Sequence, residues 1–129
     1  MGKKILVDTD VLIKAYRGDS RTYKELQRIK SDFCISAITA MELYAGAGSI
    51  KKLTSLRREL KAYEILHLNE DISATALKFF STYHPASKLY IPDFLIAATA
   101  LHYGMELYTD NKKEYRIIRA LKFYNEKYV

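Results

Sequence analysis

Short hydrophobic runs alternate along this chain with longer stretches in which apolar residues recur every three or four positions. The short runs predict strands at residues 4–8, 33–36, 64–68 and 106–109, with residues 121–124 as a candidate fifth. The longer stretches predict helices at residues 11–16, 21–30, 37–47, 50–62, 70–83, 92–103 and 112–119. Strands that alternate with helices favour an α/β fold around a mostly parallel sheet.

The composition fits one folded unit. The chain has 129 residues, of which 49% are hydrophobic and 28% charged, so we expect a single domain over residues 1–129. Its longest nearly apolar run, residues 94–101, is far shorter than the roughly 20 residues that cross a bilayer. The N-terminus does not resemble a signal peptide, and the single cysteine, Cys34, excludes an internal disulfide. We therefore expect a cytoplasmic protein without a membrane partner.

The charge balance points to an anionic partner. The chain has 21 Lys and Arg against 15 Asp and Glu, a formal charge of +6, which favours polyanions. In the C-terminal third, basic residues are interleaved with aromatic ones, a pattern compatible with single-stranded RNA. The candidate RNA-binding residues are Lys112, Lys113 and Arg116. The alternative is a solvated helix face beside core aromatics.

Acidic residues stand where a parallel sheet gathers its ligands, at the carboxyl ends of strands. Asp8 ends the first predicted strand and Asp110 the fourth, while Asp93 begins a helix and Glu42 lies within one. Two carboxylates about 4 Å apart repel by about 4 kcal/mol at an effective dielectric near 20, so their convergence requires protons or a divalent cation. Oxygen ligands select Mg²⁺ or Mn²⁺ rather than zinc. Taken singly, Asp93 could be only a helix-terminal acid and Asp110 only a turn residue.

Four segments around these acids resemble the motifs of PIN-domain ribonucleases, especially VapC-type toxins. In chain order they read ILVDTDVLI (5–13), ITAMELYAG (38–46), IPDFLIAATA (91–100) and LYTDNKKEY (107–115). Their order and spacing agree with the family over essentially the whole chain. The resemblance implies a PIN-like three-layer domain, with a short, mostly parallel central sheet and helices on both faces. It also implies an endoribonuclease that depends on Mg²⁺ or Mn²⁺.

The resemblance carries over to individual positions. The residues that we expect to act as catalytic groups and metal ligands are Asp8, Glu42, Asp93 and Asp110. At the fourth position the family often has its acid or Asn two residues after the Thr, so Asn111 or Glu114 could replace Asp110 there. The accessory candidates are Asp10, Thr109, Asn111 and Glu114.

Two other functions fit part of the pattern. Asp8-Thr-Asp10 after an apolar strand also suits a haloacid-dehalogenase-like phosphatase, with Asp8 as nucleophile and Asp10 as acid and base. A PIN-like module that binds RNA without cleaving it is the second alternative. An inactive descendant would have no reason to keep carboxylates that repel one another.

One predicted helix could serve a protein partner. In residues 50–62, Leu53, Leu56 and Leu60 recur at helical spacing among Lys and Arg, which suits the wall of a groove for a partner helix. Resemblance to VapC-type toxins implies that this partner is a small antitoxin, and that the chain forms a homodimer. The alternative is that the leucines pack inward.

Overall fold

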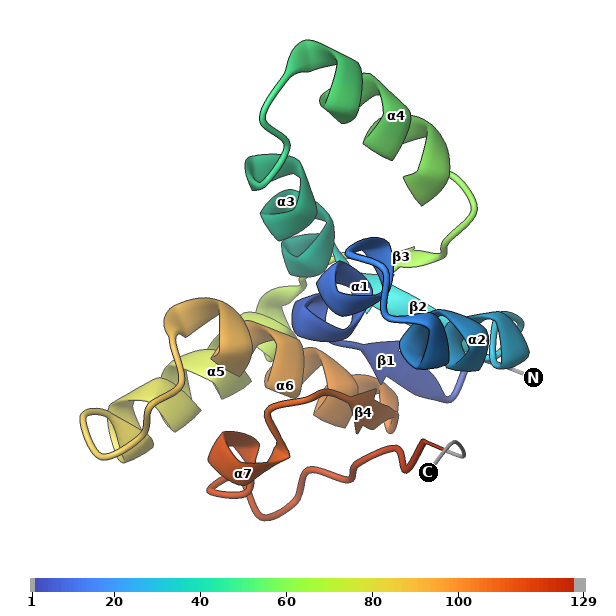
Figure 1. The fold of residues 1–129 in the computed structure, drawn as a ribbon. Coiled ribbons are helices and arrows are strands. Elements are labelled where there is room, and N and C mark those ends of the chain that lie inside the picture. Colours follow the sequence, from blue (N-terminus) through green and yellow to red (C-terminus); the bar gives the residue numbers. More distant parts are fainter. Residues whose placement is uncertain (1, 127–129) are drawn as a thin grey trace.

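A computed structural model describes residues 2–126 and contains a four-stranded sheet at its centre (Figure 1). The strands are β1 (Ile5–Val7), β2 (Phe33–Ser36), β3 (Ile65–Leu66) and β4 (Glu106–Tyr108). Their spatial order is β3-β2-β1-β4, and every pairing is parallel. The four predicted strands and their parallel arrangement are confirmed.

Helices connect the strands as the hydrophobic spacing predicts. They are α1 (Thr9–Tyr16), α2 (Ser20–Arg28), α3 (Ala37–Ala45), α4 (Ile50–Leu60), α5 (Glu70–Tyr83), α6 (Ile91–Tyr103) and α7 (Lys112–Tyr115). The first helix begins two residues earlier than predicted because Asp8, placed by the sequence in the strand, is its N-cap. The longest of these helices, α5, has 14 residues. None of the helices within residues 2–126 is long and apolar enough to cross a membrane.

The C-terminal elements are shorter than predicted. The helix expected at residues 112–119 ends at Tyr115, and the candidate strand at residues 121–124 forms one isolated parallel bridge, between Leu107 and Phe123. The N–H of Leu107 donates to the carbonyl of Lys122 over 2.8 Å, and the N–H of Tyr124 donates to that of Leu107 over 2.9 Å. This segment therefore covers the edge of β4 without becoming a full strand.

Two hydrophobic clusters pack on opposite faces of the sheet, because successive strand residues point to opposite sides. Leu6, Cys34 and Leu107 face the cluster built with α5 and α6. Val7, Ile35 and Tyr108 face the cluster built with α1 to α4. The helices thus cover both faces (Figure 1), and the predicted three-layer α/β architecture is confirmed.

Candidate active site

A cleft of about 430 Å³ lies at the carboxyl ends of β1 and β4. Its acidic lining residues are Asp8, Asp10, Glu42, Asp93 and Asp110, and its other lining residues are Thr9, Ile13, Tyr90 and Asn111. These residues come from four separate parts of the chain. The structure therefore brings together the four acids that the sequence selects, as well as the accessory Asp10.

Asp8 is buried and held from two sides. One carboxylate oxygen, Oδ1, accepts the N–H of Thr9 over 2.9 Å, and the other, Oδ2, accepts the hydroxyl of Thr109 over 2.8 Å. Burial, followed by the charge of Asp10, raises the pKa of Asp8 to about 7. In the fold without a cation, this carboxyl is therefore partly protonated near neutral pH.

Asp10 is the least satisfied acid of the cleft. Its Oδ2 accepts the N–H of Asp110 over 3.2 Å and lies 3.3 Å from the Thr109 hydroxyl. Its Oδ1 is buried and has no hydrogen-bond partner among the described residues. Burial and the charge of Asp110 raise the pKa of Asp10 to about 6. A buried carboxylate oxygen without a donor is costly, and a cation would satisfy it.

Glu42 reaches the cleft from α3. Its Oε1 accepts the hydroxyl of Thr9 over 2.7 Å, and the hydroxyl oxygen of Thr39 lies 2.9 Å from that of Thr9. Both threonines are buried. The two hydroxyls therefore hold the Glu42 carboxylate through its Oε1 atom, on the side that faces α1.

Asp93 stands in the first turn of α6, where a negative charge is favourable. Its Oδ2 accepts the N–H of Tyr90 over 2.8 Å, and the Tyr115 hydroxyl donates to its Oδ1 over 3.3 Å. Burial raises the pKa of Asp93. Burial, Asp8 and Asp93 raise the pKa of Tyr115, which keeps its hydroxyl protonated at neutral pH.

Of the three candidates for the fourth acidic position, two line the cleft. Asp110 lines the cleft but is exposed, and its carboxylate lies 3.6 Å from the Lys14 ammonium. Asn111 also lines the cleft, and its N–H donates to the Thr109 hydroxyl over 3.0 Å. Glu114 is not among the lining residues. Asp110 and Asn111 therefore remain the candidates.

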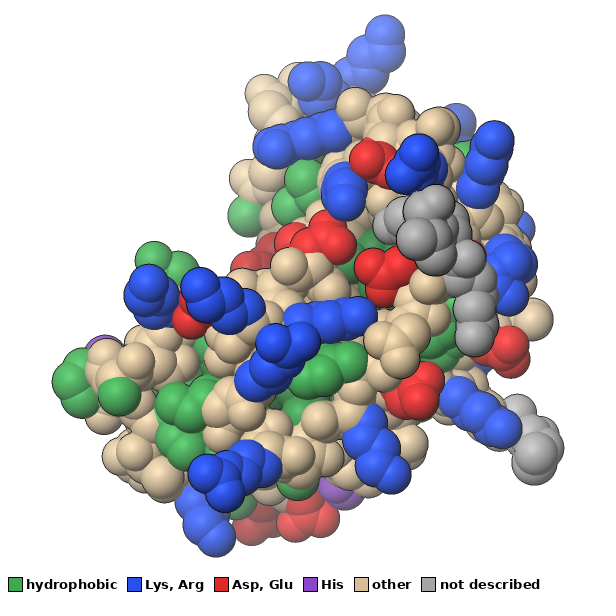
Figure 2. Space-filling view, turned by 60° about the horizontal axis from the view of Figure 1, so that its bottom comes forward, with side chains coloured by type: hydrophobic (Ala, Val, Ile, Leu, Met, Phe, Trp, Pro, Cys, Tyr) green, Lys and Arg blue, Asp and Glu red, His purple; other side chains and the backbone are tan. Residues whose placement is uncertain are grey.

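The predicted RNA-binding residues lie on or beside α7. Lys113 and Arg116 are exposed. The Lys112 ammonium lies 3.3 Å from Asn125 Oδ1 and 3.5 Å from the Glu126 carboxylate, so part of its charge is already neutralised within the chain. Figure 2 shows acidic side chains towards the middle of one face, with Lys and Arg side chains around them.

The chemistry of the cleft fits a hard divalent cation. The ligand atoms that its acids offer are all oxygens, three of these acids (Asp8, Asp10 and Asp93) have raised pKa values, and Asp10 Oδ1 is a buried acceptor without a donor. Within residues 2–126, no three His, Cys, Asp or Glu side chains already form an ion-binding group.

Three residues of the site lie outside the sequence-based selection. Thr9 orients Glu42, Tyr90 lines the cleft and Tyr115 contacts Asp93. Thr9 stands between the two aspartates of the first segment, so its place in that motif is a usable signal. The contact of Tyr115 with Asp93 joins residues 22 positions apart, and no local pattern marks it.

Known proteins with this architecture include several toxin–antitoxin assemblies. A toxin–antitoxin complex from Klebsiella pneumoniae matches with a TM-score of 0.78 and 29% identity, over 95% of this chain and 99% of that one. FitAcB from Neisseria gonorrhoeae matches with a TM-score of 0.77 and 25% identity, over 94% and 96%. DNA-bound VapBC from Salmonella typhimurium has a TM-score of 0.81 at 21% identity, over 95% and 97%, and shows the shared fold.

The sequence itself matches a family description. No curated protein matches the chain by sequence, but the PIN domain model matches residues 5–120. This match sets aside the haloacid-dehalogenase-like alternative for Asp8 and Asp10, and it confirms the resemblance to VapC-type toxins. The chain belongs to the PIN domain family.

Proposed function

We propose that this protein is a VapC-type toxin that hydrolyses RNA phosphodiester bonds with the help of Mg²⁺ or Mn²⁺. The observation that carries the proposal is the cleft at the strand ends, where five acids from distant parts of a PIN domain meet. We also propose that residues 1–129 act as one domain, because both hydrophobic clusters pack on a single sheet.

The residues of the cleft have distinct tasks in this reaction. Asp8, Glu42 and Asp93 would hold the cation, with Asp110 or Asn111 at the fourth position and Asp10 beside them. The chemistry that a divalent cation would supply there is activation of a water molecule and neutralisation of charge on the phosphate and the leaving oxygen. The hydroxyls of Thr9 and Thr109 orient Glu42 and Asp8. Cys34 is not an alternative nucleophile, because burial raises its pKa to about 12.

The rim of the cleft suits a nucleic-acid strand. Tyr90 lines the cleft and is 76% exposed, so its ring is available for stacking on a base. Lys113 and Arg116 are exposed cations that could contact phosphates. These residues support single-stranded or loop RNA as the substrate.

Removing divalent cations should abolish RNA cleavage by the purified protein, and adding Mg²⁺ or Mn²⁺ should restore it. The reason is that the described site offers carboxylates but no activated side-chain nucleophile. Gel assays on single-stranded and hairpin RNA with EDTA measure this, with Asp8→Asn protein purified in parallel to reveal contaminating nuclease. Cleavage that persists in EDTA and is absent from the variant contradicts the metal mechanism. Absence of cleavage with either cation favours the non-catalytic alternative.

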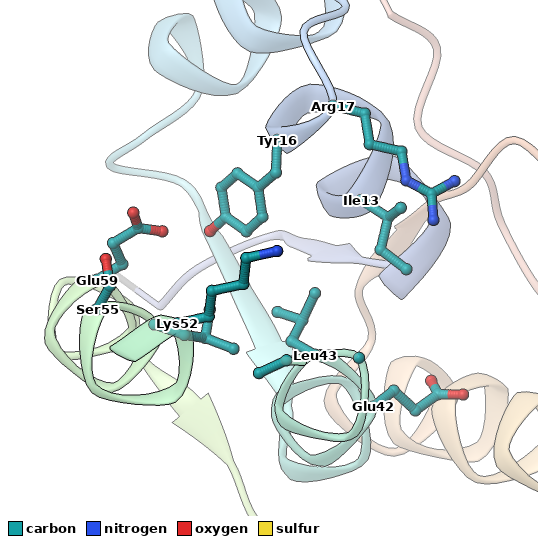
Figure 3. A pocket seen from close by; sticks show the side chains of 11 residues that line it. Ile13, Tyr16, Arg17, Glu42, Leu43, Lys52, Ser55 and Glu59 are labelled. Carbon is teal, nitrogen blue, oxygen red and sulfur yellow. The ribbon is translucent and has the colours of Figure 1, made fainter. Parts of the chain in front are cut away.

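A second groove shares Glu42 with the acidic cleft, and we propose that it binds the antitoxin. It has a volume of about 500 Å³ and lies between α1, α3 and α4. Ile13 and Leu43 supply apolar walls (Figure 3), and Leu56 also lines it. Of the three leucines that the sequence assigns to this wall, Leu56 lines the groove, whereas Leu60 is buried in the core. Leu53 is half-buried and is not among the lining residues.

The groove leads towards the acids. Ile13 and Glu42 line both the groove and the cleft, so a peptide bound in the groove would end beside the candidate metal ligands. Its wall carries two cations, Arg17 and Lys52, and two acids, Glu42 and Glu59. We therefore propose an amphipathic antitoxin segment flanked by both acidic and basic residues as the occupant.

An apolar surface on α5 and α6 suits a second copy of the chain. Leu77 and Ile91 are 71% and 61% exposed, and both line a pocket of about 210 Å³ that also includes Phe80 and Phe94. Apolar side chains grouped in this way favour association. We propose this surface as the homodimer interface.

Light scattering at micromolar concentration should give about twice the 14.9 kDa mass of the chain. If the chain is a VapC-type toxin, we expect a small antitoxin gene beside its own gene. Adding the product of that gene should give a larger complex and inhibit RNA cleavage, because the proposed groove leads to the acids. Leu77→Lys should shift the particle mass in the absence of antitoxin from that of a dimer towards that of a monomer, because it places a charge in the proposed interface. A mass near 15 kDa throughout the range contradicts the homodimer, and uninhibited cleavage contradicts the antitoxin.

A further inference from the structure

The side chain of Tyr115 connects the hydrophobic core to the acidic cleft. It is fully buried, with 0% of its surface exposed, and its ring belongs to the core cluster built with α5 and α6. Its hydroxyl ends 3.3 Å from Asp93 Oδ1 and also interacts with the carboxylate of Asp8. The ring thus fills the core while its polar tip reaches a candidate metal ligand.

Packing alone does not require this hydroxyl. A phenylalanine ring would fill the same space without bringing a polar group into the core, where an unpaired hydroxyl is costly. The hydroxyl is instead directed at the carboxylate of Asp93. An ionised carboxylate has no hydrogen to donate, so it needs donors such as this hydroxyl. Its position is therefore matched to the acid and not to the apolar surroundings.

Asp93 is held through both of its oxygens. The backbone N–H of Tyr90 binds Oδ2 over 2.8 Å, and the Tyr115 hydroxyl binds Oδ1. The backbone contact belongs to the start of α6 and does not involve the side chain of residue 115. The Tyr115 hydroxyl is the side-chain donor to this carboxylate. Each oxygen keeps a further lone pair for a ligand in the cleft.

We infer that Tyr115 is a positioning residue, whose hydroxyl fixes the Asp93 carboxylate in the orientation that binds the divalent cation. This inference rests on the proposed function, because it requires a cation in the cleft. Outer partners of metal ligands affect metal affinity strongly, and their loss typically lowers it by about 10- to 100-fold. The Tyr115 contact is long for a hydrogen bond, so we expect an effect near the lower end of that range.

Calorimetric titration of the full chain with Mn²⁺ tests the inference without relying on activity. Tyr115→Phe should fold like the wild type and bind Mn²⁺ about tenfold more weakly. In an Asp93→Ala background, which offers the hydroxyl no acceptor at residue 93, the same substitution should change the affinity clearly less than in the wild type. Any change that remains acts through Asp8, whose carboxylate also interacts with Tyr115.

Tyr124→Phe is the matched control. Tyr124 is also a buried tyrosine whose hydroxyl donates to an acid, Glu25, and its hydroxyl accepts a hydrogen bond from Arg28 over 2.7 Å, outside the cleft. Its removal should lower the melting temperature without changing the Mn²⁺ affinity.

The outcomes are separable. If wild-type protein does not bind Mn²⁺, the proposed function fails. If the wild type binds Mn²⁺ and Tyr115→Phe binds within twofold of it, the positioning role fails while the proposed function stands. A Tyr115→Phe protein that does not fold also overturns the role, because it assigns the hydroxyl to stability of the core.

Discussion

Replacing Asp8 or Asp93 by asparagine should lower RNA cleavage at least about a hundredfold. Asparagine keeps the shape of the side chain but removes the negative charge that would attract the cation. Loss of an outer partner alone typically costs 10- to 100-fold in activity, so loss of a ligand should cost at least the larger figure. Initial rates on one RNA substrate, at saturating Mg²⁺ and at saturating Mn²⁺, measure the effect.

Both variants should remain folded, and Asp8→Asn should melt at the same or a higher temperature than the wild type without a cation. Asp8 is buried beside Asp10, and both burial and repulsion oppose its ionised form. Asp71→Asn, on the exposed surface of α5 and outside the cleft, is the matched control and should cleave normally. Near-normal turnover of both site variants would show that the acids have been assigned wrongly.

The gathering of the acids could be predicted because it follows from topology. Once residues 5–7 and 106–108 are parallel neighbours, whatever follows each strand meets at the same edge. Asp8 and Asp110 are therefore brought together by strand pairing alone. The positions of Asp93 and Glu42 on helices allow both to face this edge but do not by themselves show that they reach it, and the family resemblance supported their assignment.

The details that the sequence could not supply depend on tertiary contacts. The Lys14 ammonium lies 3.6 Å from the Asp110 carboxylate, although 96 positions separate the two residues in the chain. Asp110 is exposed and already has this cation as a partner. Leu60 shows the usual spacing of an amphipathic helix, but burial against the α1 side of the sheet, and not the spacing, decided its role. The helix at residue 112 ends early because the following segment turns to cover β4.

The same burial that gathers the acids makes the metal-free fold sensitive to pH. The pKa of Asp8 rises from an ordinary 3.8 to about 7, and that of Asp10 to about 6. At a pH between the ordinary pKa and the raised one, each of these carboxyls holds a proton in the folded chain that it has lost in the unfolded chain. The free energy of unfolding from these two groups is therefore greatest at low pH and falls as pH rises through 6 and 7. Asp19, whose pKa is lowered, acts in the opposite sense only at more acidic pH.

In the presence of EDTA, the protein should therefore melt at a temperature lower by about 4 °C or more at pH 8 than at pH 5.5. The double variant Asp8→Asn/Asp10→Asn should lose most of this difference, which separates the two acids from the three histidines. Mn²⁺ added at pH 8 should restore the wild-type melting temperature, because a bound cation replaces the protons that the acids have lost. Differential scanning calorimetry measures all three. A melting temperature that is flat or rises between pH 5.5 and 8 would mean that Asp8 and Asp10 are not strained in the folded chain. The repulsion that motivates a cation in this cleft would then be absent.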